Sequence, residues 1–250
     1  MKTWIKILIV IVALLAIAVA AFVVWGSTPL GPMPEALDAL QSDAIVEVTT
    51  DPWLSFLPTQ NPQTTGLIYY PGGRVDPRSY APMARAIAEA GYPVVIVPMP
   101  LNLAVFGVGR AADVIAAYPD VEKWTIGGHS LGGSMAANFI SDNPGLIDGL
   151  FFAASYPASS DDLSGFSELT AYSVSATEDG LATPDKIDAS RPLLPADTTW
   201  VPIAGGNHAQ FGYYGEQPGD GLATISREEQ HRQAVEAAVQ MLNTIRSKGQ

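Results

Sequence analysis

The residues best suited to chemistry surround a serine in a glycine-rich turn. Residues 128–132 (GHSLG) have the G-x-S-x-G spacing, with a strand candidate before them and a run of small, helix-compatible residues after them. A nucleophilic serine on such a sharp turn has strained backbone, so the side chains two positions before and after it must be nearly absent. The helix amino end also places NH groups and a positive partial charge near the serine oxygen. The spacing therefore predicts a nucleophile at Ser130 rather than an ordinary glycine turn.

A serine hydroxyl is a weak nucleophile alone and needs a base, so the three histidines are the next candidates. His208 lies in the loop 204–211 (AGGNHAQF), directly after the last strand candidate, where a base is expected. The alternative is a loop histidine that makes only local hydrogen bonds. His129 adjoins the nucleophile, and adjacent side chains on a tight turn diverge, so we expect it to support the turn. His231, in the run REEQHR, is expected on a solvated helix face.

An acid that orients the base should lie between the serine and the histidine in sequence. The segment 177–184 (TEDGLATP) follows a strand candidate and offers two acids before a helix whose first turn contains a proline. Asp179 is preferred over Glu178 because it directly precedes Gly180 at the apex of the loop. Such an acid could instead only cap the turn. Weaker candidates in loop middles or on helix faces are Asp161, Asp162, Asp185 and Asp188.

The elements that must position these side chains alternate along the chain. Short β-rich runs, several of them unbroken apolar stretches, predict strands at Ala44–Thr50, Gly66–Tyr70, Pro93–Pro98, Lys123–Gly127, Leu150–Ala154, Leu169–Ala176 and Thr199–Ala204. Helical patterns occur at Pro77–Ala90, Gly109–Tyr118, Leu131–Ser141, Pro184–Ala189 and Ser226–Arg246. This alternation predicts an α/β fold with a doubly wound, mostly parallel sheet covered by helices. Chemistry in such sheets collects at the carboxyl ends of the strands.

Three separated motifs resemble the α/β-hydrolase superfamily, specifically its compact dienelactone-hydrolase-like branch of bacterial serine hydrolases. They are the elbow GHSLGG, the acid loop TEDGLATPD and the histidine loop GGNHAQFG, and the resemblance extends from about residue 45 to residue 243. It implies that Ser130 attacks an acyl carbon, that His208 is the base and that Asp179 orients the imidazole. Dienelactone hydrolases proper carry a cysteine nucleophile, and this chain has no cysteine, so their substrate does not transfer.

The resemblance also places an oxyanion-binding loop at residues 69–75 (YYPGGRV). In the family this loop is usually written H-G-G or H-G-x, whereas Tyr70-Pro71 replaces the histidine here. The oxyanion hole would be built from the Leu131 NH and the NH of either Gly73 or Arg74. One such donor typically contributes about 3 to 4 kcal/mol to lowering the barrier. The glycine pair could also be a simple turn.

Two loops bear on the substrate. Residues 99–107 (MPLNLAVFG) follow a strand and are expected to line the mouth of the site, with Asn102 as a polar contact or as plain packing. A lid commonly follows the sixth strand of the superfamily, but here only the 14 residues 155–168 separate two strand candidates. No large cap fits. An open, shallow site suits small or extended esters and does not indicate a lipase that buries a whole lipid.

The N-terminus carries much of the apolar composition. Residues 7–25 run for 19 residues without a charge, long enough for a helix to cross a hydrocarbon layer of about 30 Å. Lys2 and Lys6 before this run, with Glu35 and Asp38 beyond it, place the body outside the cytoplasm by the positive-inside rule. The alternative is a signal peptide cleaved after residues 18–20 (AVA). We expect an anchor at 1–25, a proline-rich spacer at 26–34 and an α/β-hydrolase domain at 35–250.

Composition limits the remaining function classes. The chain has 250 residues, is 48% hydrophobic and has a net charge of −12, which disfavours both disorder and nucleic-acid binding. With no cysteine there is no disulfide or thiolate metal site, and no metal, cofactor or phosphate-cradling motif is evident. The expectation is a membrane-anchored, extracytoplasmic serine hydrolase that acts on a small-molecule acyl ester. An acyltransferase with the same triad and a non-catalytic binding protein on this fold remain alternatives, and the oligomeric state stays open.

Overall fold

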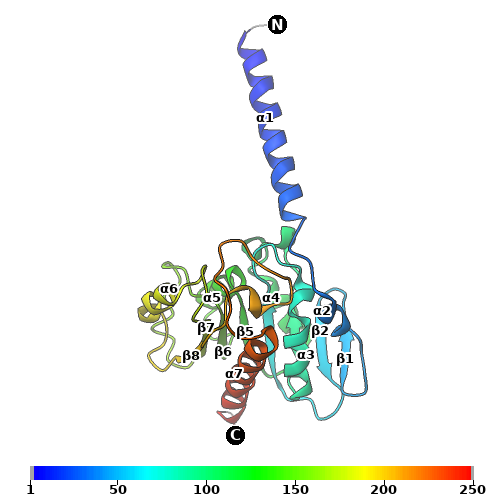
Figure 1. Ribbon diagram of the computed structural model, residues 1–250, viewed down its shortest axis with the longest axis vertical. Coiled ribbons are helices and arrows are strands. Elements are labelled where there is room, and N and C mark those ends of the chain that lie inside the picture. The colour runs from blue at the N-terminus through cyan, green and yellow to red at the C-terminus, as the bar shows by residue number, and fades with distance from the viewer. Residues whose placement is uncertain (1–2, 249–250) are drawn as a thin grey trace.

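One eight-stranded sheet forms the centre of the computed structural model, which describes residues 3–248 (Figure 1). The strands are β1 (Val46–Thr49), β2 (Leu54–Pro58), β3 (Thr65–Tyr70), β4 (Val94–Ile96), β5 (Lys123–His129), β6 (Gly149–Ala153), β7 (Thr170–Ala176) and β8 (Thr199–Ile203). Their order is β1-β2-β4-β3-β5-β6-β7-β8, and every pair from β4 to β8 is parallel. The two pairs that involve β2 are antiparallel.

Helices cover both faces of this sheet. They are α2 (Pro34–Asp38), α3 (Ala81–Glu89), α4 (Arg110–Ala117), α5 (Leu131–Asp142), α6 (Pro184–Ala189) and α7 (Arg227–Ser247), after an N-terminal α1 (Thr3–Gly26). In β3, Leu67 and Tyr69 join the core that contains α3 and α7, whereas Ile68 and Tyr70 join the core that contains α4 and α5. Successive side chains of a strand point to opposite faces, so a strand buried on both faces is apolar throughout.

The predicted doubly wound, mostly parallel α/β fold is confirmed. Each predicted strand and helix of the body is present, with boundaries that differ by a few residues. The sequence analysis missed β2 and α2. β2 is a five-residue strand that a proline closes, and it sits next to a turn-rich segment that hides its apolar pattern. Residues 155–168 between β6 and β7 form turns and no helix, so this segment adds no capping domain at the carboxyl edge of the sheet.

The helix α1 extends away from the body, on the side opposite to the C-terminal end of α7 (Figure 1). Its 24 residues correspond to about 36 Å at 1.5 Å per residue, which is enough to cross a bilayer core of about 30 Å. All its side chains from Trp4 to Trp25 are at least partly exposed. By length and composition α1 fits either a single membrane anchor or a signal sequence.

Candidate active site

Ser130 occupies the sharp turn between β5 and α5. Its backbone has φ 52° and ψ −123°, a region that non-glycine residues rarely adopt. The Ser130 NH donates to the Ala153 carbonyl at 3.1 Å, and the Ser155 hydroxyl donates to the Ser130 carbonyl at 2.6 Å. These bonds to the end of β6 and the residues after it hold the strained serine at the carboxyl edge of the sheet.

The glycines two positions before and after Ser130 make this turn sterically possible. A Cβ on Gly128 would lie 2.5 Å from the Tyr70 carbonyl oxygen of β3, and a Cβ on Gly132 would overlap the Tyr70 and Pro71 carbonyls. Contacts this short do not occur between real side chains and backbone, so only glycine lets α5 pack against β3. The G-x-S-x-G spacing thus has the steric origin that the sequence analysis assigned to it.

His208 and Asp179 form a buried pair beside the serine. The His208 Nδ1 lies 2.8 Å from the Asp179 Oδ2, and both side chains are almost fully buried. The Asp179 Oδ1 accepts the NH groups of Leu181 and Ala182, each at 2.8 Å. The His208 Nε2 has no hydrogen-bond partner in residues 3–248, and His208 lines the same cavity as Ser130. An imidazole fixed at Nδ1 with a free Nε2 is arranged to accept a proton.

The structure separates Asp179 from the other acids proposed for its position. Glu178 is exposed, and its carboxylate accepts the Thr177 hydroxyl at 3.1 Å. Asp161 is buried but accepts from the side chains of Asn138 and Ser160. The three remaining candidates are exposed and make no contact with the histidine: Asp162, Asp185 and Asp188. Of the predicted acids, only Asp179 meets His208.

Asp220 is a supporting residue that the sequence analysis missed. Its Oδ1 accepts the His208 NH at 3.1 Å and the Gly180 NH at 3.2 Å, and its Oδ2 accepts the Ala209 NH at 2.8 Å. One carboxylate therefore ties the acid loop to the histidine loop. The sequence around it, PGDG, is typical of an ordinary turn and gives no sign of this contact.

His129 supports the turn from inside the core, as its position suggested. The Tyr80 hydroxyl accepts the Gly72 NH at 3.0 Å and shares a second hydrogen bond of 2.9 Å with the His129 Nδ1. Burial lowers the pKa of His129 well below its usual value, and the nearby His208 lowers it further. The imidazole centroids of His129 and His208 are 4.4 Å apart, so a neutral His129 places no positive charge beside His208.

The prediction for His231 is wrong. This histidine is buried rather than solvated, with its ring 4.6 Å from the Tyr213 ring in an edge-on arrangement. Burial lowers the pKa of His231 to about 3, with a smaller contribution from Arg227. The helical periodicity of α7 places position 231 on the inward face together with Ala234 and Ala238.

The two alternatives for the second oxyanion donor differ in their hydrogen bonds. The Arg74 NH donates to the Asn102 carbonyl at 2.7 Å, so it is not free to bind an oxyanion. The Gly73 NH makes no hydrogen bond within residues 3–248, and a Cβ on Gly73 would lie 3.2 Å from the Leu131 Cδ2. The Leu131 NH begins α5, where helical NH groups have no acceptor inside the helix. The geometry therefore favours Leu131 with Gly73.

The structure places Asn102 against the end of α1 and not in the cavity of Ser130, which favours the packing alternative for this residue over a substrate contact. Its side-chain amide donates to the Gly26 carbonyl at 2.9 Å, and it does not line the cavity of Ser130. Leu101 and Asn102 both have φ of 53°, and this left-handed backbone turns the loop toward the end of α1. Sequence position after a strand could not reveal that turn.

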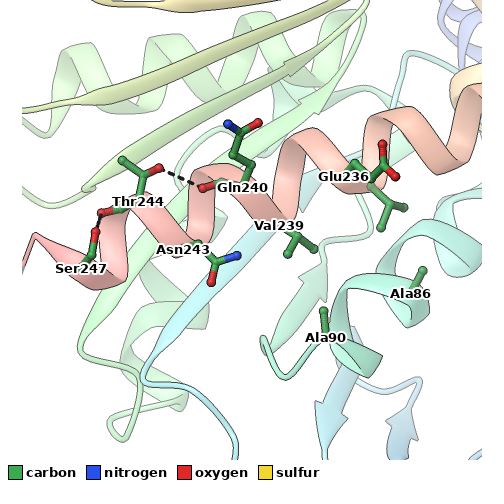
Figure 2. Close-up of a pocket in the computed structure, with 9 residues that line it drawn as sticks. Ala86, Ala90, Glu236, Val239, Gln240, Asn243, Thr244 and Ser247 are labelled. Carbon is green, nitrogen blue, oxygen red and sulfur yellow. Dashed lines mark hydrogen bonds between the residues drawn. The ribbon is translucent and has the colours of Figure 1, made fainter.

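The cavity at the candidate site has a volume of about 290 Å³. It is lined by Ser130, Leu131, Ser134, Ala154, Ser155, Tyr156, Leu181, Ala182 and His208. A larger hollow of about 540 Å³ lies between α3 and α7 (Figure 2). There the hydroxyls of Thr244 and Ser247 bond back to carbonyls of their own helix, and no base faces a nucleophile. The smaller cavity is therefore the better candidate for an active site.

Metal ligands are not grouped in the part of the chain that the structure covers. Between residues 3 and 248, no set of three or more His, Cys, Asp or Glu side chains is placed to hold a metal ion. The buried carboxylates of Asp161 and Asp179 are instead used by hydrogen-bond donors of the protein.

Comparison with known proteins agrees with this fold. Esterase 2 of Thermogutta terrifontis, in a structure phosphorylated by paraoxon, superposes with a TM-score of 0.59 at 14% identity over 80% of this chain and 93% of that one. A putative dienelactone hydrolase of Klebsiella pneumoniae gives 0.57 at 12% identity over 80% and 98%. No curated protein sequence matches the chain. The model of the alpha/beta hydrolase family matches residues 66–232, about two thirds of the sequence. The superfamily resemblance of the three motifs is confirmed: the chain belongs to the alpha/beta hydrolase family.

Proposed function

We propose that the protein is a serine hydrolase that cleaves an ester or related acyl bond through an acyl-enzyme on Ser130. The observation that carries this proposal is the buried Asp179–His208 pair, whose free Nε2 shares one cavity with a serine held in strained backbone. Such strain persists only where the surrounding structure imposes it, and it clusters at functional sites. The esterase and dienelactone-hydrolase structures of the same fold support the same reaction class.

The mechanism follows from the positions of these groups. The Ser130 Oγ attacks the acyl carbon while the His208 Nε2 takes the hydroxyl proton, and Asp179 holds the proton on Nδ1. The NH groups of Leu131 and Gly73 bind the oxyanion of the tetrahedral intermediate. His208 then gives its proton to the leaving alcohol. Water next attacks the acyl-enzyme by the same steps in reverse, so that the acid gains OH and Ser130 regains its proton.

Covalent labelling by a fluorophosphonate tests the nucleophile directly. The native chain should be labelled, and Ser130→Ala should not be, because the attacking oxygen is gone. Ser134→Ala is the matched control, since Ser134 lines the same cavity from the next turn of α5 and should label normally. Labelling that persisted in Ser130→Ala would place the nucleophile elsewhere. A native chain that neither labels nor hydrolyses p-nitrophenyl esters of increasing chain length would instead favour a non-catalytic protein.

The location proposed for the catalytic domain is the outer face of the cell membrane, with α1 retained as a single-pass anchor. The length of α1 and the two lysines in the first six residues support this orientation. Membrane fractionation and external protease should find the body attached and accessible from outside. Protein free in the medium with a mature start near Ala21 would establish the signal-peptide alternative.

A further inference from the structure

The end of α1 and the loop after β4 share one apolar surface, which we call the junction surface: Phe22, Trp25, Leu101, Val105 and Phe106. The ring centroids of Phe22 and Phe106 are 6.2 Å apart with the rings edge-on, and those of Phe22 and Trp25 are 5.7 Å apart. Val105 is 47% exposed and Phe106 is 52% exposed. Two large apolar side chains that are exposed next to a candidate anchor indicate a surface that contacts the membrane rather than water.

The junction surface is held in one orientation relative to the body. The Arg74 guanidinium donates to the Trp25 carbonyl at 2.9 Å and to the Thr28 carbonyl at 2.7 Å, and it lies 4.4 Å from the Trp25 ring centroid. The Leu30 NH donates to the Arg74 carbonyl at 2.7 Å, so the spacer runs along the body instead of hanging free. The direction of α1 therefore fixes which side of the body faces a bilayer.

The contact with α1 determines how deep the loop of Val105 and Phe106 lies in the bilayer. Phe22 belongs to the apolar run 7–25, and Trp25 ends that run where an aromatic residue typically marks the membrane interface. A side chain packed against Phe22 lies at a similar depth. Phe106 must therefore enter the interface whenever α1 spans the bilayer, and Val105 enters beside it.

The same surface leads to the catalytic cavity. A Cβ on Gly73, next to Arg74, would lie 3.7 Å from the Leu103 side chain and 3.2 Å from the Leu131 side chain. Leu131 in turn lines the cavity beside Ser130. Residues 104–106 also lie against α5, the helix that begins at Leu131, so the loop of the junction surface runs close to the cavity wall. Figure 1 shows α1 leaving the body at the end away from the C-terminus. The end of α1 bonds to Arg74, which follows β3, and to Asn102, which follows β4, so it lies at the carboxyl ends of these strands.

We propose that the junction surface seats the body on the bilayer, so that the catalytic cavity opens toward the leaflet and takes acyl esters that reside in it. This inference rests on the proposed hydrolase function and on a retained α1. A cavity of about 290 Å³ needs to admit only the ester and its nearest groups, since the rest of an amphiphile stays in the bilayer. Without Lys2 and Lys6 the body has 11 basic and 25 acidic residues, a net charge of −14, so apolar contact rather than anionic head groups attracts it to the bilayer.

A depth measurement tests the orientation without any activity. Because the chain has no cysteine, Phe106→Cys and Leu146→Cys each give one site for an environment-sensitive fluorophore on the full-length protein. Leu146 is the matched control, 42% exposed just before β6 and thus at the amino end of a strand. In phosphatidylcholine vesicles, doxyl-labelled lipid should quench the label at position 106 several-fold more than the label at 146. Equal quenching at the two positions would overturn the proposal.

A paired substrate assay tests the substrate class. Phe106→Glu should lower the turnover of 4-methylumbelliferyl oleate embedded in the vesicles by about ten-fold, because a carboxylate resists entry into the interface. Turnover of water-soluble 4-methylumbelliferyl butyrate should stay within about two-fold, as should both activities of Leu146→Glu, an exposed change far from the site. Parallel loss of both activities, or no loss in Phe106→Glu, would overturn the proposal. A native protein that cleaved neither ester would refute the hydrolase function, while the quenching would still decide the orientation.

Discussion

Replacement of Asp179 by asparagine changes one atom of the acid while its partners stay in place. In the native chain, the Asp179 Oδ1 accepts the NH groups of Leu181 and Ala182. The Asp179 Oδ2 lies 2.8 Å from the His208 Nδ1. In Asp179→Asn the amide oxygen must face the two NH groups, so its NH₂ points at Nδ1. An NH₂ can only donate, so Nδ1 becomes the acceptor and the imidazole proton moves to Nε2. The base then has no lone pair for the Ser130 proton.

The expected loss of turnover in Asp179→Asn depends on the free energy needed to turn the asparagine amide over. Turning the amide over would restore the correct tautomer but would set NH₂ against two buried NH groups. Each lost hydrogen bond in a buried site costs about 1 to 3 kcal/mol, so the two together cost about 2 to 6 kcal/mol. At about 1.4 kcal/mol per ten-fold, this corresponds to a loss of about 30-fold to about 10⁴-fold in turnover. A loss of about 10⁴ is the value known for this change in a serine triad of the same geometry.

The assay compares kcat for one chromogenic ester between the native chain, Asp179→Asn and Glu178→Gln. The Glu178 variant is the matched control, because this neighbouring carboxylate is exposed and meets only the Thr177 hydroxyl. We expect near-normal turnover in Glu178→Gln. Near-normal turnover in Asp179→Asn would refute the tautomer argument, and collapse in Glu178→Gln alone would transfer the orienting role to Glu178.

Three further changes test the elbow and the core. Gly132→Ala should lower the free energy of unfolding by about 3 kcal/mol or more, because its methyl group would overlap the Tyr70 carbonyl. Urea denaturation should show this as a reduced midpoint, and an unchanged midpoint would contradict the packing argument. Ser155→Ala removes the 2.6 Å bond to the Ser130 carbonyl and should cost about 1 kcal/mol of stability with a turnover loss below about ten-fold, measured on the same ester. His231 stays neutral in the folded state down to a pKa of about 3, whereas the unfolded state gains a proton below about 6.5, so acid favours unfolding. Urea titrations should therefore show that His231→Gln loses about 2 kcal/mol less stability than the native chain between pH 7 and pH 5, and identical losses would show that His231 is not buried and neutral.

Local patterns carried most of the information about the fold and about the candidate triad. The strands β3 and β6 are largely apolar because both faces are buried, and this pattern is visible in the sequence of each strand alone. The glycine spacing around Ser130 was readable for the same reason, because each glycine answers a steric demand of the turn itself. The strand β2, between β1 and β4 in the sheet, had no such pattern, because Ser55 and Pro58 interrupt its short apolar run.

Contacts between residues far apart in the chain could not be predicted from the sequence. Asp220 meets His208 and Gly180 only because two loops converge at the edge of the sheet, and its own sequence resembles a common turn. Asn102 was assigned to the site because it follows a strand, but a left-handed backbone turns it to Gly26. His231 was misjudged because its neighbours in sequence are charged, whereas the inward face of α7 is set by residues three and seven positions later.

The carboxylate of Asp220 also determines how the two loops of the candidate site unfold locally. Because it bonds to NH groups of both the acid loop and the histidine loop, neither loop can open alone without breaking a bond to Asp220. The two loops should therefore form one cooperative unit of local unfolding. The amide protons of Gly180, His208 and Ala209 would then exchange with solvent through one shared opening event. Heat would inactivate such an enzyme at the temperature of this local opening, below the temperature at which the sheet itself melts.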